Sequence, residues 1–290
     1  MGASLASPDY RLPEHPLMVI CAKVPRVSPV LFAVVVAVSE LAAGTAYGAV
    51  CSAKSGPKTV VLVELYTSEG CSSCPPADRW LSTSFPAGGA GTTAIPLAFH
   101  VDYWDRLGWK DRFATAAYTE RQYDAMRANR ARFVYTPQVL VQGKDFPEWR
   151  AQSAPAAFSS ASAKPARAEI ALDAEPQRGL ISVKATARVP SGADRKGAAL
   201  YVALADNGLA SDVKAGENAG VRLAHDHVVR FLRAGPAPDA NGEIRWDLTL
   251  PVPSEAGSET TVVAFVQSAA AGDVLQALAL PLTAACAPLR

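Results

Sequence analysis

Two cysteines three positions apart are the residues of this sequence best suited to chemistry. Cys71 and Cys74 form a C-x-x-C motif between an apolar run that ends at Tyr66 and a segment that begins with Pro75-Pro76. Because prolines are tolerated in the first turn of a helix, this context predicts a strand, a turn and a helix start. The N–H groups and dipole of a helix start stabilise a thiolate, which is the nucleophile in thiol–disulfide exchange. We therefore expect Cys71 to attack a partner disulfide and Cys74 to resolve the mixed disulfide.

Three further side chains are candidates for a substrate cleft beside this pair. His100, Asp102 and Trp104 lie at the end of the apolar run 94–101, at the sheet edge from which the C-x-x-C turn should emerge. Ligands of open α/β sheets bind at this edge. The alternative for the first two is structural, namely a hydrogen-bonded histidine and an aspartate that caps a loop.

The sequence gives little support for metal or cofactor chemistry. His225 and His227 would share one face of a strand, where two imidazoles can hold a metal ion, but no third ligand is evident. Two thiolates alone do not make a zinc or copper site. A P-loop, a dinucleotide fingerprint and a nucleophilic serine motif are all missing. We therefore expect no cofactor and no metal.

The elements that position these residues change character near residue 165. Residues 57–165 read as βαβαββ, with strands over 59–66, 94–101 and 139–141, a short fourth strand after Gln142-Gly143, and helices from residue 75 and over about 113–129. A last helix is expected over 155–163, within a linker at 151–168. Beyond residue 166, alternating apolar and polar residues predict about six or seven short strands, enough for a sandwich. The predicted fold is an α/β domain, residues 49–165, followed by an all-β sandwich domain, residues 166–290.

Composition limits the classes of partner. The 290 residues are 49% hydrophobic and 19% charged, so the chain folds around cores rather than remaining disordered. Lys plus Arg number 28 against 27 Asp plus Glu, which leaves no bulk positive charge to concentrate nucleic acid. We expect no nucleic-acid partner.

The first 48 residues predict a secretory signal. Lys23 and Arg26 precede the apolar run 30–41, which gives way to small residues that end at Gly48. A membrane anchor is the less favoured alternative, because the run is shorter than the roughly 20 residues that a membrane-spanning helix needs and contains Glu40. Cleavage after Gly48 would leave a periplasmic or extracellular protein with no stable membrane span.

Export changes how the cysteines are interpreted. Cys21 is lost with the signal, which leaves four cysteines in an oxidising compartment. Four cysteines allow three pairings, and the short loop favours Cys71 with Cys74. Cys51 and Cys286 would then form a structural disulfide that joins the two ends of the mature chain.

Residues 57–163 resemble the thioredoxin-like superfamily in their strand order, in the C-x-x-C at a helix start and in Thr136-Pro137 before a strand. The resemblance implies that Pro137 is cis and packs against the cysteine pair, and it places Thr136 in the candidate cleft. The chain departs from thioredoxins proper because no tryptophan precedes Cys71 and Ser72-Ser73 replaces their Gly-Pro. The reduction potential of thioredoxins is therefore not assigned to the Cys71/Cys74 pair.

Glu64 is a further candidate that this resemblance implies. Thioredoxins keep a buried carboxylate on the comparable strand six residues before the first cysteine, whereas Glu64 lies seven residues before Cys71. Burial raises the pKa of a carboxyl group, which suits a proton acceptor for the resolving thiol. The alternative is that Glu64 forms an ion pair with a cation such as Lys58 or Arg79, or reaches solvent.

Longer motifs resemble the exported family DUF1223. They are the stretches 64–78, 100–104 and 135–138, and 216–218 together with 225–230. The likeness spans most of the mature chain and implies a fold and an exported location more firmly than a reaction. The predicted function is a thiol–disulfide oxidoreductase that acts on exported protein thiols and disulfides or on small thiols. The alternative is a non-catalytic exported binding protein whose C-x-x-C is a structural disulfide.

Overall fold

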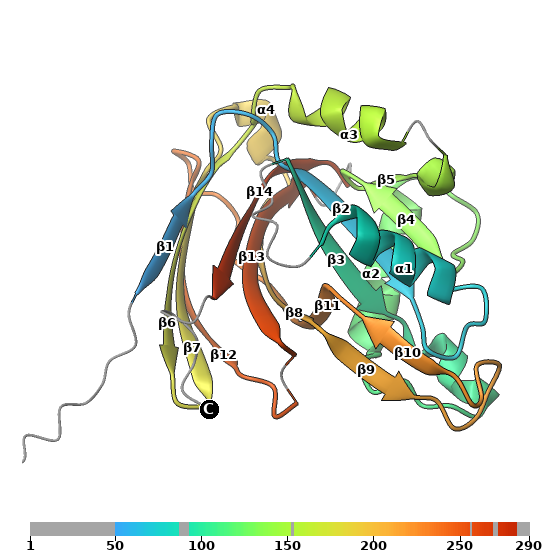
Figure 1. Ribbon diagram of the computed structural model, residues 1–290. Coiled ribbons are helices and arrows are strands. Elements are labelled where there is room, and N and C mark those ends of the chain that lie inside the picture. Colours follow the sequence, from blue (N-terminus) through green and yellow to red (C-terminus); the bar gives the residue numbers. More distant parts are fainter. Residues whose placement is uncertain (1–49, 87–92, 152–153, 256, 269–271, 283–290) are drawn as a thin grey trace, which may run out of the picture. The chain divides into compact units, whose positions relative to one another are not determined.

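The computed structural model describes residues 50–86, 93–151, 154–255, 257–268 and 272–282, and its largest element is a mixed sheet (Figure 1). The expected signal, residues 1–48, lies outside the described residues. Eight strands of the described chain form this sheet. In order across it they are β14 (Val274–Leu282), β13 (Glu259–Ser268), β8 (Ala198–Asn207), β11 (Val228–Ala234), β3 (Ala94–His100), β2 (Val61–Thr67), β4 (Gln138–Val141) and β5 (Lys144–Asp145).

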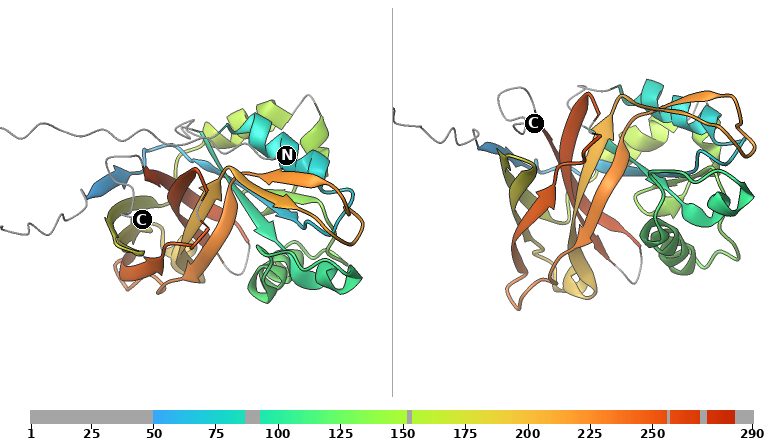
Figure 2. Two further views of the ribbon diagram at one scale, coloured as in Figure 1. Left: turned by 60° about the horizontal axis from the view of Figure 1, so that its bottom comes forward. Right: turned by 90° about the horizontal axis from the view of Figure 1, so that it is seen from below.

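A second, antiparallel sheet faces one end of the mixed sheet (Figures 1 and 2). The described residues give it four strands, in the order β1 (Cys51–Lys54), β6 (Glu169–Gln177), β7 (Leu180–Arg188) and β12 (Glu243–Pro251). Apolar side chains that alternate along β6 and β7, such as Leu172 and Val183, pack with Leu200 and Val262 of the mixed sheet. One aliphatic core therefore fills the space between the two sheets.

Helices cover both faces of the other end of the mixed sheet. Helices α1 (Pro75–Ser84) and α3 (Ala154–Ser162) pack on the face that carries Val61, Val63 and Leu65. Helix α2 (Ala116–Ala128) packs on the opposite face, where Tyr118 meets Phe99 in one apolar cluster with Leu62. Strand β2 is buried along its whole length, as expected for a continuous apolar run. The short helices are η1 (Asp102–Leu107), η2 (Pro147–Arg150) and α4 (Gly192–Arg195).

The prediction of a mixed α/β chain is confirmed, with local differences. Helix α2 begins later than expected, because Thr115 accepts a hydrogen bond from the Tyr118 N–H and caps the helix. The single strand expected to carry both His225 and His227 divides at His227, whose φ of 58° breaks the extended backbone. Its two parts are β10 (Arg222–His225), which pairs with β9 (Leu209–Asp212), and β11. The described residues after 166 thus hold nine strands rather than six or seven.

The mixed sheet continues across the expected boundary between residues 165 and 166. We call residues 49–165 the first segment and residues 166–290 the second segment. Strand β11 of the second segment pairs in parallel with β3 of the first, and the Ala98 N–H donates a 2.8 Å hydrogen bond to the carbonyl of His227. Residues of the second segment therefore reach the carboxyl end of β3, where the chemistry was expected. Within the described chain, every helix is too short or too polar to cross a membrane.

Candidate functional site

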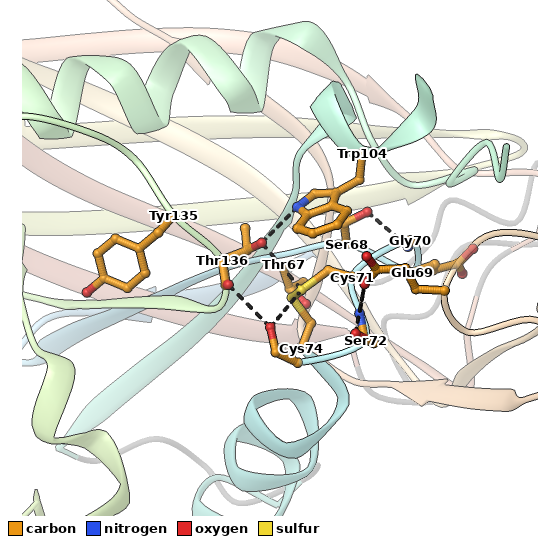
Figure 3. The surroundings of a disulfide bond; sticks show 12 residues. Thr67, Ser68, Glu69, Gly70, Cys71, Ser72, Cys74, Trp104, Tyr135 and Thr136 are labelled. Atoms are coloured by element: carbon orange, nitrogen blue, oxygen red, sulfur yellow. Dashed lines mark hydrogen bonds between the residues drawn. A yellow bond between two sulfur atoms is a disulfide. The ribbon is translucent and has the colours of Figure 1, made fainter. Parts of the chain in front are cut away.

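The Cys71–Cys74 pair forms a disulfide bond at the junction of β2 and α1, with its Cα atoms 5.4 Å apart (Figure 3). Cys74 is the N-cap of α1, and the Cys74 N–H donates to the carbonyl of Cys71 at 3.1 Å. The pair thus stands at the helix start that the sequence predicts. Both cysteines are 0% exposed, whereas Ser72 and Ser73 between them are exposed. The polypeptide turn is accessible, but its sulfur atoms are covered.

Thr136 and Trp104 lie on one side of the disulfide (Figure 3). The Thr136–Pro137 peptide bond is cis, as expected. The Thr136 hydroxyl donates to Sγ of Cys71 at 3.4 Å and accepts a 2.8 Å hydrogen bond from Nε1 of Trp104. The Ser73 hydroxyl lies 3.3 Å from the same sulfur atom. Two hydroxyl groups therefore flank Cys71, in positions where they could donate to a thiolate.

A turn from the second segment of the chain is hydrogen-bonded to the C-x-x-C turn. It joins β9 to β10, and the Asn218 side-chain amide donates to the carbonyls of Glu69 at 2.8 Å and Cys71 at 3.0 Å. Oε2 of Glu217 accepts hydrogen bonds from the Ser72 hydroxyl at 2.7 Å and the Ser72 N–H at 3.1 Å. These hydrogen bonds lower the pKa of Glu217. The sequence separation of 145 to 149 residues explains why local patterns did not predict these contacts.

A buried polar cluster lies near the C-x-x-C turn and the carboxyl end of β3. Nδ1 of His100 is 2.7 Å from Oδ2 of Asp111, and Nε2 of His225 is 3.4 Å from Oε1 of Glu69. The two imidazole rings are perpendicular neighbours, with centroids 5.0 Å apart. Nε2 of His100, both ring nitrogens of His225 and Oε1 of Glu69 are buried without a hydrogen-bond partner among the described residues. The cluster thus combines carboxylates and imidazoles in a site shielded from solvent.

Burial and mutual attraction act in opposite directions on the pKa values of the central pair. Burial by itself would lower the pKa of His100, but the charge and hydrogen bond of Asp111 outweigh burial and raise it. Burial would raise the pKa of Asp111, yet His100 and the N–H groups of Glu69 and Phe113 lower it. The geometry therefore favours the ionised pair.

Asp78 is a buried carboxyl group that sequence reasoning missed. It lies four residues after Cys74 on α1, a spacing that puts two side chains on one helix face, and it accepts a 3.2 Å hydrogen bond from the Thr67 hydroxyl. Burial raises the pKa of Asp78, while the imidazoles of His225 and His100 oppose the rise. The spacing from Cys74 was the available signal, but an acidic residue in a first helical turn also has a purely local explanation.

Glu64 is not placed to accept a proton from the thiols, which corrects that expectation. Its neighbours Leu62 and Tyr66 pack on the α2 side of the sheet, and side chains alternate along a strand, so Glu64 faces away from α1. Oε1 of Glu64 instead accepts hydrogen bonds from Nε and Nη2 of Arg121, at 2.8 and 2.6 Å. The ion-pair alternative is confirmed, with Arg121 of α2 as the cation rather than Lys58 or Arg79.

The candidate cleft residues separate into two groups. Trp104 and Thr136 meet at the disulfide, and His100 lies in the buried cluster. Asp102 instead accepts a 2.6 Å hydrogen bond from the Thr119 hydroxyl of α2, and its own N–H donates to that hydroxyl at 3.1 Å. Asp102 is therefore tied to α2, and its place in a substrate cleft stays a prediction.

Two other expectations concern His227 and the second cysteine pair. Nε2 of His227 lies 2.7 Å from the carbonyl of Phe85, whereas His225 faces Glu69, so the two histidines do not form a common site. Cys286 lies outside the described residues, and its disulfide with Cys51 stays a prediction.

The geometry can now be compared with known proteins. The profile of a family described as "Protein of unknown function (DUF1223)" matches residues 62–267. The chain belongs to the DUF1223 family. The matched range of this DUF1223 protein includes the cysteine pair, the cis proline and the turn that carries Asn218. No curated protein sequence matches the chain.

Two solved structures are similar to this DUF1223 protein. The crystal structure of a structural-genomics target from Agrobacterium tumefaciens has 25% sequence identity and a TM-score of 0.54, over 78% of this chain and 96% of its own. HBP35 of Porphyromonas gingivalis has 16% identity and a TM-score of 0.58, over 77% of this chain and 75% of its own. The second likeness shows a shared fold and no more.

Proposed function

We propose that this DUF1223 protein is an exported thiol–disulfide oxidoreductase, made of a thioredoxin-like domain, residues 49–165, and a β-sandwich domain, residues 166–290. The observation that carries the proposal is the C-x-x-C disulfide at the start of α1, with the Thr136 hydroxyl on Sγ of Cys71. Its partners are thiols and disulfides of exported proteins or small thiols. Export itself rests on the secretory signal expected over residues 1–48.

The exchange follows from the positions of the two cysteines. In the reducing direction, the Cys71 thiolate attacks one sulfur atom of a partner disulfide, the partner's S–S bond breaks, and its second sulfur leaves as a thiolate that takes a proton. The Cys74 thiolate then attacks Sγ of Cys71, which re-forms the Cys71–Cys74 bond and releases the first partner sulfur as a thiolate, which is protonated in turn. Two electrons and two protons pass from the protein to the partner. Oxidation of a partner dithiol is the reverse sequence.

The surroundings assign different roles to the two thiols. The hydroxyls of Thr136 and Ser73 lie 3.4 and 3.3 Å from Sγ of Cys71. Hydrogen bonds donated to a thiolate lower the pKa of the thiol, so Cys71 is the better nucleophile. Cys74 shares a buried helix face with Asp78, whose raised pKa suits transient acceptance of the Cys74 proton.

Trapping of a mixed disulfide tests this function. With an oxidised cysteine-containing peptide as partner, reduced protein carrying Cys74→Ser should accumulate a covalent adduct at Cys71, because no resolving thiol is present. Cys71→Ser should form little adduct and should reduce the peptide no faster than buffer does. Mass spectrometry of the adducts, under acid quench, is the measurement, and Thr83→Ala, on the exposed side of α1, is the control that should leave the exchange rate unchanged.

The alternative function keeps one specific observation in its favour, since both cysteines are fully buried. A non-catalytic binding protein would use the bond as a structural clip. A reduction potential of the Cys71–Cys74 pair below about −300 mV, together with no peptide adduct in either variant, would favour this alternative.

The role of Asp78 gives a second test within the same reaction. Asp78→Asn should slow the resolving step roughly 100-fold near neutral pH, because the amide cannot accept the Cys74 proton. The measurement is alkylation of Cys74 against pH in the Cys71→Ser background, where the inflection due to the Asp78 carboxyl should disappear. Thr83→Ala, on the exposed side of α1, is the control. An identical pH profile with Asn at position 78 would contradict the role.

A further inference from the structure

The covered state of the disulfide conflicts with the chemistry proposed for it. In thiol–disulfide exchange, the incoming sulfur atom must reach one sulfur of the bond, so the rate depends on access. Cys71 and Cys74 are both 0% exposed, although Ser72 between them is exposed. Part of the structure must therefore move before any partner can react.

We propose that the turn Val213–Val221 is a gate over the disulfide, held closed by Glu217 and Asn218, and that partners reach Cys71 only when this turn is displaced. The inference rests on the proposed function, because it concerns regulation of the same site. It also assigns a task to the second segment of the chain, from which the gate comes.

The contacts of the gate with the cysteine turn come from two adjacent side chains. Asn218 donates to the carbonyls of Glu69 and Cys71, and Glu217 accepts from the N–H and hydroxyl of Ser72. The Glu217 carboxylate is exposed, so water can replace its hydrogen bonds at little cost. Of these two side chains only Asn218 is buried, and it is the main lock.

The opposite side of the disulfide is built more firmly into the fold. Trp104 donates to Thr136, and Thr136 donates to Cys71, so three segments are tied in series. Gly70 of the cysteine turn also packs against this side, since a side chain at position 70 would approach Cβ of Trp104 to 3.1 Å. Movement on this side would disturb the packing of η1 against the cysteine turn.

The hairpin that carries the gate is anchored at its base. The Arg112 guanidinium donates to the carbonyl of Ala210 at 2.7 Å and to the Ser211 hydroxyl at 3.1 Å, both on β9. The backbone pair between Val213 and Val221 closes the neck of the turn, with a 3.0 Å hydrogen bond. Beyond this neck, Glu217 and Asn218 hold the residues to the cysteine turn, and Gly216 lies against Trp109, whose Cβ a side chain at position 216 would approach to 3.2 Å. The expected motion is therefore a displacement of the tip while the base stays fixed.

The test measures access to the disulfide without requiring catalysis. The probe is dithiothreitol, and the readout is the rate at which the Cys71–Cys74 bond of the oxidised protein is reduced. Asn218→Ala removes two hydrogen bonds and should speed reduction roughly tenfold or more. Glu217→Gln keeps the size of the side chain, weakens a charge-assisted acceptor and should speed reduction less. Lys214→Ala, exposed in the same turn, is the matched control and should leave the rate unchanged.

A second readout is hydrogen exchange of the Ser72 N–H, which Glu217 protects in the closed turn. Exchange of this N–H should become faster in both gate variants. The readout also keeps the proposal testable if Asn218→Ala folds poorly, because Glu217→Gln changes only an exposed group. Equal reduction and exchange rates in the wild type and both gate variants would overturn the gate. Faster reduction by dithiothreitol, combined with no exchange with a cysteine-containing peptide in any variant, would support the gate and refute the proposed function.

Discussion

Asp111→Ala is expected to lower the free energy of unfolding by about 3–5 kcal/mol, because it breaks a buried ion pair by removing one partner. The Asp111 carboxylate accepts hydrogen bonds from Nδ1 of His100 at 2.7 Å, from the Glu69 N–H at 2.8 Å and from the Phe113 N–H at 2.9 Å. Alanine leaves all three donors buried without this acceptor. Each unsatisfied buried group costs about 1–3 kcal/mol, so a loss at the upper end of the range is reasonable.

The size of this loss should depend on pH in a defined direction. The pKa of Asp111 is lowered in the folded protein, so its contribution is present above the unfolded carboxyl pKa of about 3.9 and is lost as the pH falls through the folded value. The pKa of His100 is raised, so its contribution is complete below the unfolded value of about 6.5 and is lost as the pH rises through the folded value. The difference between wild type and variant should therefore be largest between about pH 4 and 6.5.

Urea unfolding of the oxidised protein at pH 5.5 and at pH 8.5 measures the effect. Asp124→Ala is the matched control, because Asp124 is 69% exposed in an ion pair with Arg127, and its loss should change stability by less than about 0.5 kcal/mol. A loss below about 1 kcal/mol for Asp111→Ala at pH 5.5 would show that the ion pair with His100 does not hold this loop.

Glu64 and Arg121 should show strong coupling in a double-mutant cycle. Their side chains are 1% and 11% exposed, and Arg121 also lies 5.2 to 5.4 Å from the ring centroids of Phe99, Tyr201 and Phe265. Glu64→Leu leaves a buried guanidinium group unpaired, and Arg121→Met leaves a buried carboxylate unpaired. Each single change should cost about 3–5 kcal/mol.

The double variant Glu64→Leu, Arg121→Met should cost less than either single change, because apolar residues of similar volume can replace a buried ion pair with little net loss. Chemical denaturation of the four proteins gives the coupling free energy. Arg127→Met, an exposed arginine of the same helix, serves as the control. Additive losses in the double variant would mean that the two side chains stabilise the protein independently.

Local sequence patterns were sufficient for the elements around the disulfide. The continuous apolar run of β2 and Pro75-Pro76 predicted a buried strand followed by a helix start, whereas the cis bond at Thr136-Pro137 was correctly implied by the superfamily resemblance rather than by a local pattern. The face of β2 on which Glu64 lies was not resolved, because a shift of one residue reverses the face of every side chain in a strand. A difference of one residue in register therefore decided whether Glu64 was interpreted as a proton acceptor for the cysteines or as an ion-pair partner.

Local sequence patterns did not predict the contacts made by the second segment. Asn218 meets Cys71 across 147 residues, and His225 meets Glu69 through the hairpin of β9 and β10. Periodicity shows which face of an element is buried but does not identify its partner. Asp78 was missed for another reason, since its role depends on what burial and the two histidines do to a carboxyl group that looks ordinary on a helix.

The parallel pairing of β3 with β11 also bears on how such a protein can change over evolutionary time. A domain that is joined to a separate second domain can lose, exchange or duplicate that second domain, because the hydrogen bonds of its own edge strands do not depend on it. Here the Ala98 N–H takes its acceptor from His227, and β11 in turn pairs with β8, so the two segments complete one another's hydrogen bonding. Removing the second segment would open an apolar sheet edge, which favours aggregation. The two segments are therefore expected to be retained together, because each satisfies hydrogen bonds at an edge of the other.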